Sequence, residues 1–289
     1  MDPQRPGTMA VAWHTRLLSM IEEHPWLEAA QRQVTPWVNP LLERADAVGL
    51  KDWLHGRPIG HALHPIAVDL PIGFWTSAFL LDLVGARRSA RVLTAAGIAS
   101  ALGAAATGAA DWSATDGRER RLGLFHGLLN LAGVALQTVA LVSRRRYRPW
   151  SWAGYTVSSA AAYVGGELVF GRGIMVDHDA WTAGPANWTP ACRLEEIPDG
   201  GIAGVEVGRR TVLLYRQGTR VSAMEDACTH LGGPLHEGTV EDGCVTCPWH
   251  GSQFRLSDGR VVRGPATFSA LRLETRSRAG QVEVRGRQG

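Results

Sequence analysis

The sequence has few cysteines, a single lysine and, in its first half, long stretches with almost no charge. Four cysteines in 289 residues exclude a small disulfide-stapled scaffold, and 45% hydrophobic residues exclude a disordered chain. The formal net charge of +3 comes from arginine, since Lys51 is the only lysine. These arginines lie beside the apolar stretches rather than among aromatic residues on a basic face, so we expect no nucleic acid partner.

Four apolar stretches have the length needed to cross a bilayer. A helix rises about 1.5 Å per residue, so a hydrocarbon core about 30 Å thick needs about 20 apolar residues. The alternative, a soluble helical bundle, would show more regular polar faces on its helices. The sequence therefore predicts a four-helix transmembrane domain over residues 57–171. Its spans are expected at Ile66–Gly85, Arg91–Ala110, Leu122–Val142 and Trp150–Gly171.

Residues 1–56 mix tryptophan and leucine with charged residues at roughly helical spacing. Prolines at 25, 36 and 40 are expected to break this region into short helices. Such amphipathic helices lie on a membrane surface, or cap a helix bundle, more readily than they span a membrane. No uninterrupted apolar core follows a basic start, so we expect no cleavable signal peptide here.

After Gly171 the pattern changes to short alternating strands separated by glycine turns. Residues 172–191 contain glycine and proline and are predicted to form a linker. A linker of about 20 residues can extend to about 66 Å, enough to let a following domain swing. Residues 192–289 are predicted to form an antiparallel β domain, which is large enough to fold alone.

The strongest motif in the chain lies inside this β domain. Cys228-Thr229-His230 is followed by Cys247-Pro248-Trp249-His250, which gives the pattern C-x-H-x16-C-x2-H. Two cysteines and two histidines in paired loops could bind zinc, and Cys244 forms a further C-x2-C pair with Cys247.

The residues around this motif closely resemble the Rieske [2Fe-2S] family. The resemblance includes Cys228–Leu235, Cys247–Phe254 and a later Gly264-Pro265-Ala266, and it extends from about Cys192 to the carboxyl end. It implies a [2Fe-2S] cluster with one iron held by two thiolates and the other by two imidazoles. The implied ligands are Cys228 and Cys247 on one iron and His230 and His250 on the other, with Gly232, Gly251 and Ser252 around the cluster.

The loops also depart from one branch of that family. Rieske proteins of cytochrome bc complexes carry an extra cysteine pair, but Gly233 and Trp249 stand at the corresponding positions. The sequence is therefore more similar to the Rieske ferredoxins that serve oxygenases. It does not resemble the oxygenase itself, because only 39 residues follow His250.

The membrane half is similar to a bacterial four-helix membrane family of undetermined function, found alone or fused to Rieske domains. The similarity covers about residues 50–180. It is carried by His61-Ala62-Leu63-His64-Pro65, Asp69-Leu70-Pro71-Ile72-Gly73, Asp111-Trp112 and His126-Gly127. This resemblance implies no activity by itself.

Three functions fit this fusion. The first is a membrane-anchored electron carrier that relays single electrons between a membrane redox partner, either a protein or a quinone, and an unknown acceptor. The second is a quinol- or haem-linked membrane oxidoreductase, in which His64 and His126 bind haem b or a quinone. The third is a cluster-sensing domain on a structural anchor. We expect an electron-transfer protein or an oxidoreductase component rather than a complete enzyme, and the sequence leaves the oligomeric state open.

Arginine placement predicts the orientation in a bacterial cell membrane. Two loops on one side carry seven arginines and no acidic residue, whereas the opposing turn carries three arginines. The positive-inside rule therefore favours a Rieske domain on the outer face. Ser143–Tyr147 also resembles a twin-arginine export signal, and the alternative is ordinary basic anchoring beside a membrane helix. A cytoplasmic Rieske domain is the alternative, because the amino-terminal stretch would otherwise also need to cross. The seven arginines are Arg87, Arg88, Arg91, Arg144, Arg145, Arg146 and Arg148.

Overall fold

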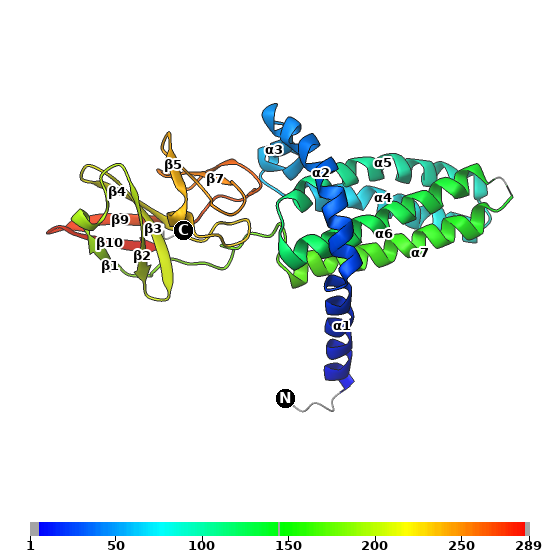
Figure 1. Ribbon diagram of the computed structural model, residues 1–289, viewed down its shortest axis with the longest axis horizontal. Coiled ribbons are helices and arrows are strands. Elements are labelled where there is room, and N and C mark those ends of the chain that lie inside the picture. The colour runs from blue at the N-terminus through cyan, green and yellow to red at the C-terminus, as the bar shows by residue number, and fades with distance from the viewer. Residues whose placement is uncertain (1–5, 144, 287–289) are drawn as a thin grey trace. The chain divides into compact units, whose positions relative to one another are not determined.

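The computed structural model describes residues 6–143 and 145–286 and divides the chain into two compact units. The helical unit consists of the residues up to Val48 together with His64–Arg172. The β unit consists of Gly49–Leu63 together with the residues from Gly173 onwards. Figure 1 shows the helical unit mainly in blue to green and the β unit mainly in yellow to red. Arg144 of the predicted export signal lies outside the described residues.

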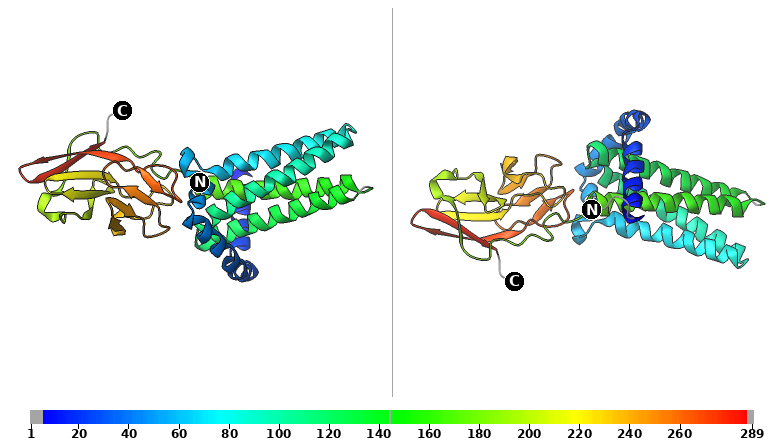
Figure 2. Two further views of the ribbon diagram at one scale, coloured as in Figure 1. Left: turned by 90° about the horizontal axis from the view of Figure 1, so that it is seen from above. Right: turned by 90° about the horizontal axis from the view of Figure 1, so that it is seen from below.

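The helical unit contains six long helices, of which α4 to α7 run alongside one another (Figures 1 and 2). His24 caps α2, which begins at Pro25 as predicted, but the breaks expected at Pro36 and Pro40 are wrong. Each of these prolines removes one main-chain donor without ending the helix. The helices are α1 (Pro6–Glu22), α2 (Pro25–Ala47), α4 (Leu63–Leu83), α5 (Arg87–Ser113), α6 (Gly117–Val142) and α7 (Tyr147–Gly166), and a π-helical turn, η2 (Glu167–Gly171), follows α7.

Three helices of the described chain, α4, α5 and α6, are long and apolar enough to cross a membrane. The predicted fourth span, α7, does not belong to this set, so the count of four is not confirmed. Small and polar residues along α7 pack against α6. Gln137 donates to the main-chain oxygen of Ser151 at 3.1 Å, and a Cβ at Gly133 would lie 2.2 Å from Oγ of Ser158.

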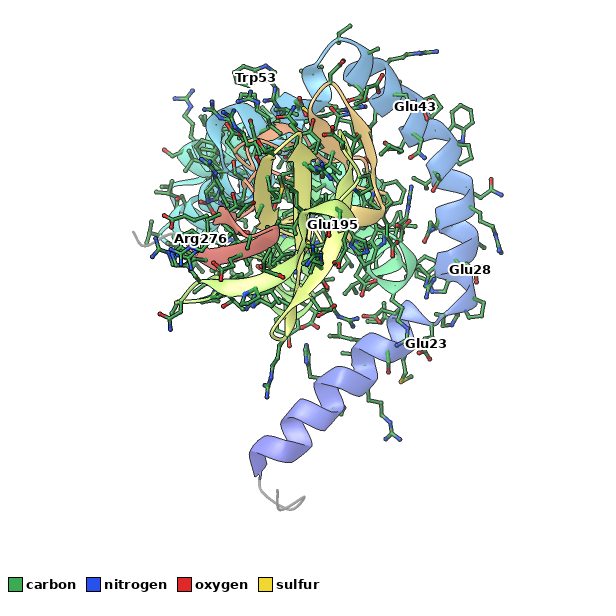
Figure 3. The ribbon with its side chains drawn as sticks, turned by 90° about the vertical axis from the view of Figure 1, so that its left-hand side faces the viewer. Glu23, Glu28, Glu43, Trp53, Glu195 and Arg276 are labelled. Carbon is green, nitrogen blue, oxygen red and sulfur yellow. The ribbon has the colours of Figure 1, made fainter. Side chains whose placement is uncertain are left out.

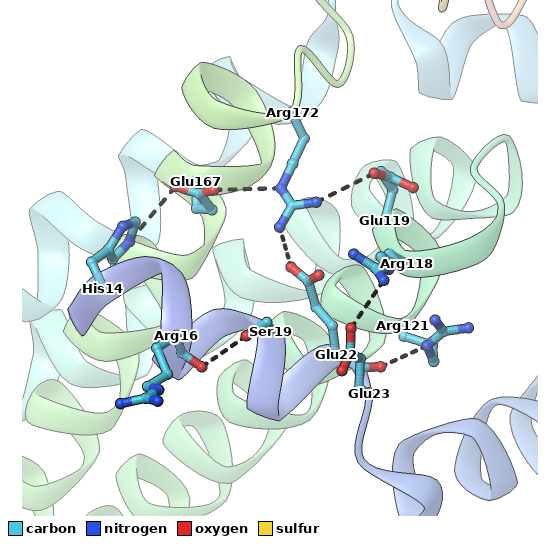
Figure 4. A network of polar contacts seen from close by, with 10 residues as sticks. All are labelled: His14, Arg16, Ser19, Glu22, Glu23, Arg118, Glu119, Arg121, Glu167 and Arg172. Carbon is cyan, nitrogen blue, oxygen red and sulfur yellow. Dashed lines mark hydrogen bonds and ion pairs between the residues drawn. The ribbon is translucent and has the colours of Figure 1, made fainter. Parts of the chain in front are cut away.

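Charged residues join α1 to α6 and η2 (Figure 4). Glu22 is buried and is paired with Arg172, which also lies 3.4 Å from Glu167 and 3.5 Å from Glu119. Burial raises the pKa of Glu22. Further contacts are His14 with Glu167, Arg118 with Glu23, and Arg121 with the main-chain oxygen of Glu22. This network fixes the carboxyl end of α1 against the helices that follow it.

Two antiparallel sheets form the core of the β unit. A six-stranded sheet has the order β1-β10-β9-β4-β3-β2, and a four-stranded sheet has the order β5-β6-β7-β8. Buried side chains such as Leu213, Met224 and Phe254 form one hydrophobic cluster, and Leu214 and Val282 belong to another. The strands are β1 (Thr189–Arg193), β2 (Ile202–Val207), β3 (Arg210–Gln217), β4 (Arg220–Glu225), β5 (Thr239–Glu241), β6 (Cys244–Thr246), β7 (Gln253–Arg255), β8 (Val261–Arg263), β9 (Arg272–Arg278) and β10 (Gln281–Gly286).

The β unit includes most of the segment that the sequence predicts to be a linker. The amide of Leu271 donates to Asp179 at 3.3 Å, and the amide of Gly286 donates to Pro185 at 2.8 Å. The side chain of Trp188 lies against Arg276 and Arg285. Residues 173–191 are therefore packed on the sheet rather than extended, because their polar groups find partners there.

Residues 49–63 also belong to the β unit, so the predicted boundary at residue 57 falls inside a packed segment. This segment contains a short helix, α3 (Leu50–His55), and a 3-10 turn, η1 (Arg57–Ile59). His55 is buried, whereas Trp53 is 57% exposed and points away from the sheets (Figure 3). No local sequence signal assigns these residues to a domain that begins more than a hundred residues later.

Candidate iron-sulfur cluster site

Two loops with the same hydrogen-bond pattern carry the predicted ligands. In the first loop, the amide of Cys228 donates to Gly233 at 2.8 Å, and the amide of Gly232 donates back to Cys228 at 2.7 Å. In the second, the amide of Cys247 donates to Ser252 at 2.8 Å, and the amide of Gly251 donates back to Cys247 at 3.1 Å. The fourth residue after each cysteine thus closes the loop on that cysteine.

A glycine is required at this fourth position in both loops. Gly232 has φ of +74° and Gly251 has φ of +77°, a left-handed conformation that side chains disfavour. The first loop follows β4, and the second joins β6 to β7. Both predicted glycines therefore have a structural role in shaping the loops beside the candidate cluster.

The loops bring the cysteines together as one pair and the histidines as another. The Cys228 and Cys247 side chains share a hydrogen bond, and the ring centroids of His230 and His250 are 5.0 Å apart. Among the described residues, no three His, Cys, Asp or Glu side chains are grouped as they would be around one metal ion. A structural zinc ion takes four ligands around one centre, whereas a two-iron cluster takes two residues on each iron. The paired arrangement therefore fits a [2Fe-2S] cluster better than zinc.

His230 has the properties of a metal ligand. Its side chain is only 3% exposed, and neither Nδ1 nor Nε2 has a hydrogen-bond partner. Burial lowers the pKa of His230 to about 3, so its imidazole is neutral and able to bind iron through a nitrogen. An unpaired buried nitrogen is unfavourable, and coordination would remove that cost.

The two cysteines are held in a buried environment. Their shared hydrogen bond is the main cause that raises the pKa of Cys228 and lowers the pKa of Cys247 to about 6. The amides of Trp249 and His250 also donate to the Cys247 sulfur and lower its pKa further. Main-chain donors to a thiolate stabilise the charged form that binds iron.

Ser252 and Gly233 complete the immediate surroundings. Ser252 is fully buried, accepts a hydrogen bond from the amide of Ala266 at 3.0 Å and bonds to Cys228. A Cβ at Gly233 would lie 2.9 Å from Sγ of Cys247 and 3.0 Å from the Trp249 ring. Gly233 is thus needed for close packing of the two loops, a reason that its place in the motif does not reveal.

Further residues around the loops make contacts that the motif does not predict. Thr229, between two predicted ligands, donates its hydroxyl to the main-chain oxygen of Phe268 at 2.8 Å. The residues Gly264–Phe268, here called the cover loop, thus contact the first cluster loop through Phe268 and the second through Ala266. Asp226 accepts from the amide of His236 at 2.8 Å and lies 2.6 Å from its Nδ1 atom. The contact between Asp226 and His236 therefore supports the first loop from the segment that follows it.

The other predicted pair, His64 and His126, is also brought together, within the helical unit. Their ring centroids are 6.3 Å apart at an interplanar angle of 90°. Nδ1 of His64 donates to the main-chain oxygen of Ala104 at 2.9 Å, and Nδ1 of His126 donates to that of Ala161 at 2.8 Å. Nε2 of His126 lies 3.1 Å from the side-chain nitrogen of Asn130.

Comparison with known proteins agrees with this division. Residues 60–178 match the family described as "Predicted membrane protein (DUF2231)", and residues 187–274 match the "Rieske [2Fe-2S] domain". The chain is 33% identical to ferredoxin CarAc of Metapseudomonas resinovorans over 34% of its own length and 94% of that ferredoxin. It is 34% identical to the anthranilate 1,2-dioxygenase ferredoxin subunit of Burkholderia cepacia over 34% of its own length and 92% of that subunit.

A solved complex of reduced oxygenase and oxidized ferredoxin in carbazole 1,9a-dioxygenase gives a related match. The identity is 30%, the TM-score is 0.33, and the match covers 35% of this chain and 97% of that chain. We base the assignment on the two ferredoxin sequences, which the chain matches over almost their whole length. The protein belongs to the Rieske [2Fe-2S] family, binds a [2Fe-2S] cluster in its β unit, and joins this domain to a DUF2231 predicted membrane protein domain.

Proposed function

We propose that the protein is a membrane-anchored Rieske electron carrier that relays single electrons between a membrane redox partner and an acceptor. The paired cysteines and histidines in two equivalent loops are the observation that carries this proposal. When bound, the cluster supplies one-electron oxidation and reduction. One of the related ferredoxins is named as the ferredoxin subunit of anthranilate 1,2-dioxygenase, which supports a carrier rather than a complete enzyme.

The ligand assignment is part of this proposal. Cys228 and Cys247 hold one iron through their sulfurs, and His230 and His250 hold the other through imidazole nitrogens. The burial of His230 and its lack of hydrogen-bond partners support this assignment. Neutral imidazoles leave less negative charge near the cluster than thiolates would, so the potential exceeds that of an all-cysteine cluster.

The exposed edge of the second loop is the proposed site of electron exchange. His230 is buried, whereas His250 is half-buried and its neighbour Trp249 is 55% exposed. A partner that approaches the second loop therefore comes closer to an iron ligand than one that approaches the first. The aromatic ring of Trp249 also offers a partner an apolar contact.

We propose a multi-pass helical unit with α7 as the fourth span and the cluster domain on the outer face of the membrane. The close packing of small residues between α6 and α7 supports the fourth span, since helices in lipid associate through such contacts. The arginine-rich loops support the orientation. Arg148 pairs with the buried Asp82 at 2.8 Å, but acidic partners contribute little to the positive-inside rule.

A matched pair of serine-to-cysteine variants tests the orientation. Ser277 follows the middle of β9 and Ser89 lies near the start of α5, and both are exposed. A membrane-impermeant thiol reagent should label Ser277→Cys but not Ser89→Cys in intact cells, relative to the unmodified chain. The reverse pattern would place the cluster domain in the cytoplasm.

A quinol- or haem-linked oxidoreductase is the second candidate, and the histidine pair of the helical unit favours it. The Nδ1 hydrogen of each ring is held by a main-chain oxygen, which fixes ring orientation as in many metal-ligating histidines. His64 and His126 come from different helices, as axial ligands of one haem often do.

One preparation distinguishes these functions. The full chain, purified anaerobically in detergent, is expected to contain two irons and to take up one electron, with the paramagnetic resonance signal of a reduced Rieske centre. The carrier function predicts no sharp α and β bands after dithionite reduction, whereas haem would produce them. Stoichiometric zinc without iron would refute both the cluster assignment and the carrier function.

A further inference from the structure

Residues Gly49–Leu63, here called the clamp segment, precede the first apolar helix yet pack within the β unit. A tight turn shapes this segment, because a Cβ at Gly56 would lie 1.9 Å from the main-chain oxygen of His61 and φ is +88°. The turn separates α3, which carries Asp52 and His55, from His61. The clamp segment thus has a defined fold of its own.

The clamp segment contacts the cover loop at both ends of that loop. Oδ1 of Asp52 accepts a hydrogen bond from the amide of Gly264 at 2.8 Å, although 212 residues separate them in sequence. A Cβ at Gly264 would lie 3.3 Å from the His55 ring. At the other end of the cover loop, the rings of His61 and Phe268 have centroids 6.2 Å apart.

The cover loop in turn holds both cluster loops. The amide of Ala266 donates to Oγ of Ser252, and the main-chain oxygen of Phe268 accepts from the hydroxyl of Thr229. Ala266, Ser252 and Thr229 are each at most 1% exposed. The contacts therefore form a continuous connection from the half-buried Asp52 to the buried residues beside the ligands.

The Ser252 hydroxyl links the cover loop to a proposed cluster ligand, Cys228. Because Oγ accepts from Ala266, the hydroxyl hydrogen remains available to Cys228, with which Ser252 shares a hydrogen bond. Donors to a cluster sulfur favour the reduced state, in which the cluster is more negative. A shift of the cover loop would therefore alter this donor and the Thr229 contact beside His230.

We propose that the clamp segment holds the cover loop against the two cluster loops, and that Asp52 is a positioning residue for the Ser252 and Thr229 contacts. This inference rests on the cluster assignment in the proposed function. The clamp segment ends at Leu63, where α4 begins. The chain thus passes between the helical unit and the β unit three times, at residues 48–49, 63–64 and 172–173. The clamp segment lies between the first two of these crossings and contacts the cover loop.

Two double variants of the full chain in detergent test this role. Asp52 also pairs with Arg57 at 2.8 Å, so a single substitution would change both charge and hydrogen bonding. Asp52→Ala with Arg57→Gln removes the charged pair and the acceptor for Gly264. Asp52→Asn with Arg57→Gln removes the same charges but keeps a side-chain oxygen as acceptor. The two variants therefore differ mainly in that hydrogen bond.

Hydrogen exchange and redox titration are the two readouts. The alanine variant should show faster amide exchange in residues 264–268 and a shifted reduction potential and g values, whereas the asparagine variant should stay close to the native chain. Replacing Glu195 and Arg193 by glutamine, an exposed pair in the same unit, is the control and should change neither readout. Glu195 of this pair is labelled in Figure 3.

Several results would overturn the proposal. These are exchange that is the same in both double variants, equal shifts of potential in both, or faster exchange without any change in potential. Exchange at residues 264–268 can be measured whether or not the iron is bound. A native chain that lacks the Rieske signal would refute the proposed function while leaving the exchange test of the clamp intact.

Discussion

The β unit and the helical unit each bring two histidines together, but the imidazole nitrogens differ in whether they have hydrogen-bond partners. In the β unit, both nitrogens of His230 are buried and have no hydrogen-bond partner. In the helical unit, the Nδ1 atoms of His64 and His126 donate to main-chain oxygens, and Asn130 approaches Nε2 of His126. The nitrogens of His230 therefore need a ligand from outside the protein. Three of the nitrogens of His64 and His126 already contact groups of the protein itself.

This difference indicates which site depends on a metal for its stability. An unpaired buried polar group costs about 1–3 kcal/mol, so the His230 arrangement is favourable once iron is bound. The His64 and His126 pair already has hydrogen bonds that help to join neighbouring helices. A haem iron at His126 would have to replace the Asn130 contact at Nε2.

The largest expected effect comes from removing the proposed ligands. Replacing Cys228 or Cys247 by serine, or His230 or His250 by alanine, should abolish the paramagnetic resonance signal of the reduced cluster. Cys192→Ser and Cys244→Ser are the controls and should keep it, because neither residue belongs to the two loops. A Rieske signal that persists in any of these four variants would contradict the assignment of that residue as a cluster ligand.

The cluster loops could be predicted because their chemistry is local in sequence. In each loop the histidine and at least one glycine follow within four positions of the cysteine, and the hydrogen bonds that close the loop join residues four and five positions apart. Gly232 and Gly251 were therefore identified by sequence alone. The paired arrangement of thiols and imidazoles needed the structure, since spacing does not show which side chains face each other.

The clamp segment could not be predicted because its contacts are remote in sequence. One hydrogen bond joins Asp52 and Gly264, and neither an aspartate nor a glycine indicates by its type that it has such a distant partner. The linker expectation failed for a related reason. Glycine and proline at residues 173–191 suggested an extended chain, but Asp179 and Trp188 find partners on β-unit residues.

A side chain at Gly233 would crowd the contact between the two cluster loops. Gly233→Ala places a Cβ against Sγ of Cys247 and the Trp249 ring, and overpacking of this kind costs about 1–3 kcal/mol. We expect a lower iron content and a lower unfolding midpoint of the full chain in detergent. Gly208→Ala, at a remote turn with open space and φ of +69°, is the control. It should lower the midpoint and leave iron content unchanged.

The stability of the β unit should depend on pH through Asp179. Burial raises the pKa of Asp179 to about 7, so folding favours its protonated form. This contribution is fully present below the usual aspartate pKa of about 4 and is lost as pH rises through about 7. The upper limit of the effect is about 4 kcal/mol.

Asp179→Asn tests this contribution, since an amide still accepts from Leu271 but does not ionise. The variant should flatten the fall in unfolding midpoint between pH 4 and pH 7, as followed by the visible circular dichroism of the cluster. Glu206→Gln, at an exposed site on β2, should keep the native dependence. An unchanged slope in Asp179→Asn would show that another group causes it.

The smallest expected effect is a change in reduction potential from one hydroxyl group. Phe254 has no hydroxyl group and so offers no donor to a cysteine sulfur, whereas Ser252 bonds to Cys228. The native potential should therefore lie in the lower half of the range of about -150 to +300 mV for Rieske centres. Ser252→Ala should lower it further, and Phe254→Tyr should raise it if the buried site accepts the added hydroxyl.

The measurement requires the full chain, because a fragment from residue 188 onwards would lack the clamp segment and the packed residues 173–187. Phe254 is fully buried, so the tyrosine hydroxyl must either reach a sulfur or strain the core. Unfolding midpoints measured beside the redox titration separate these outcomes, since strain lowers stability without raising the potential. A native potential near the upper end of the range would contradict the argument from donors, and so would a stable Phe254→Tyr variant with an unchanged potential.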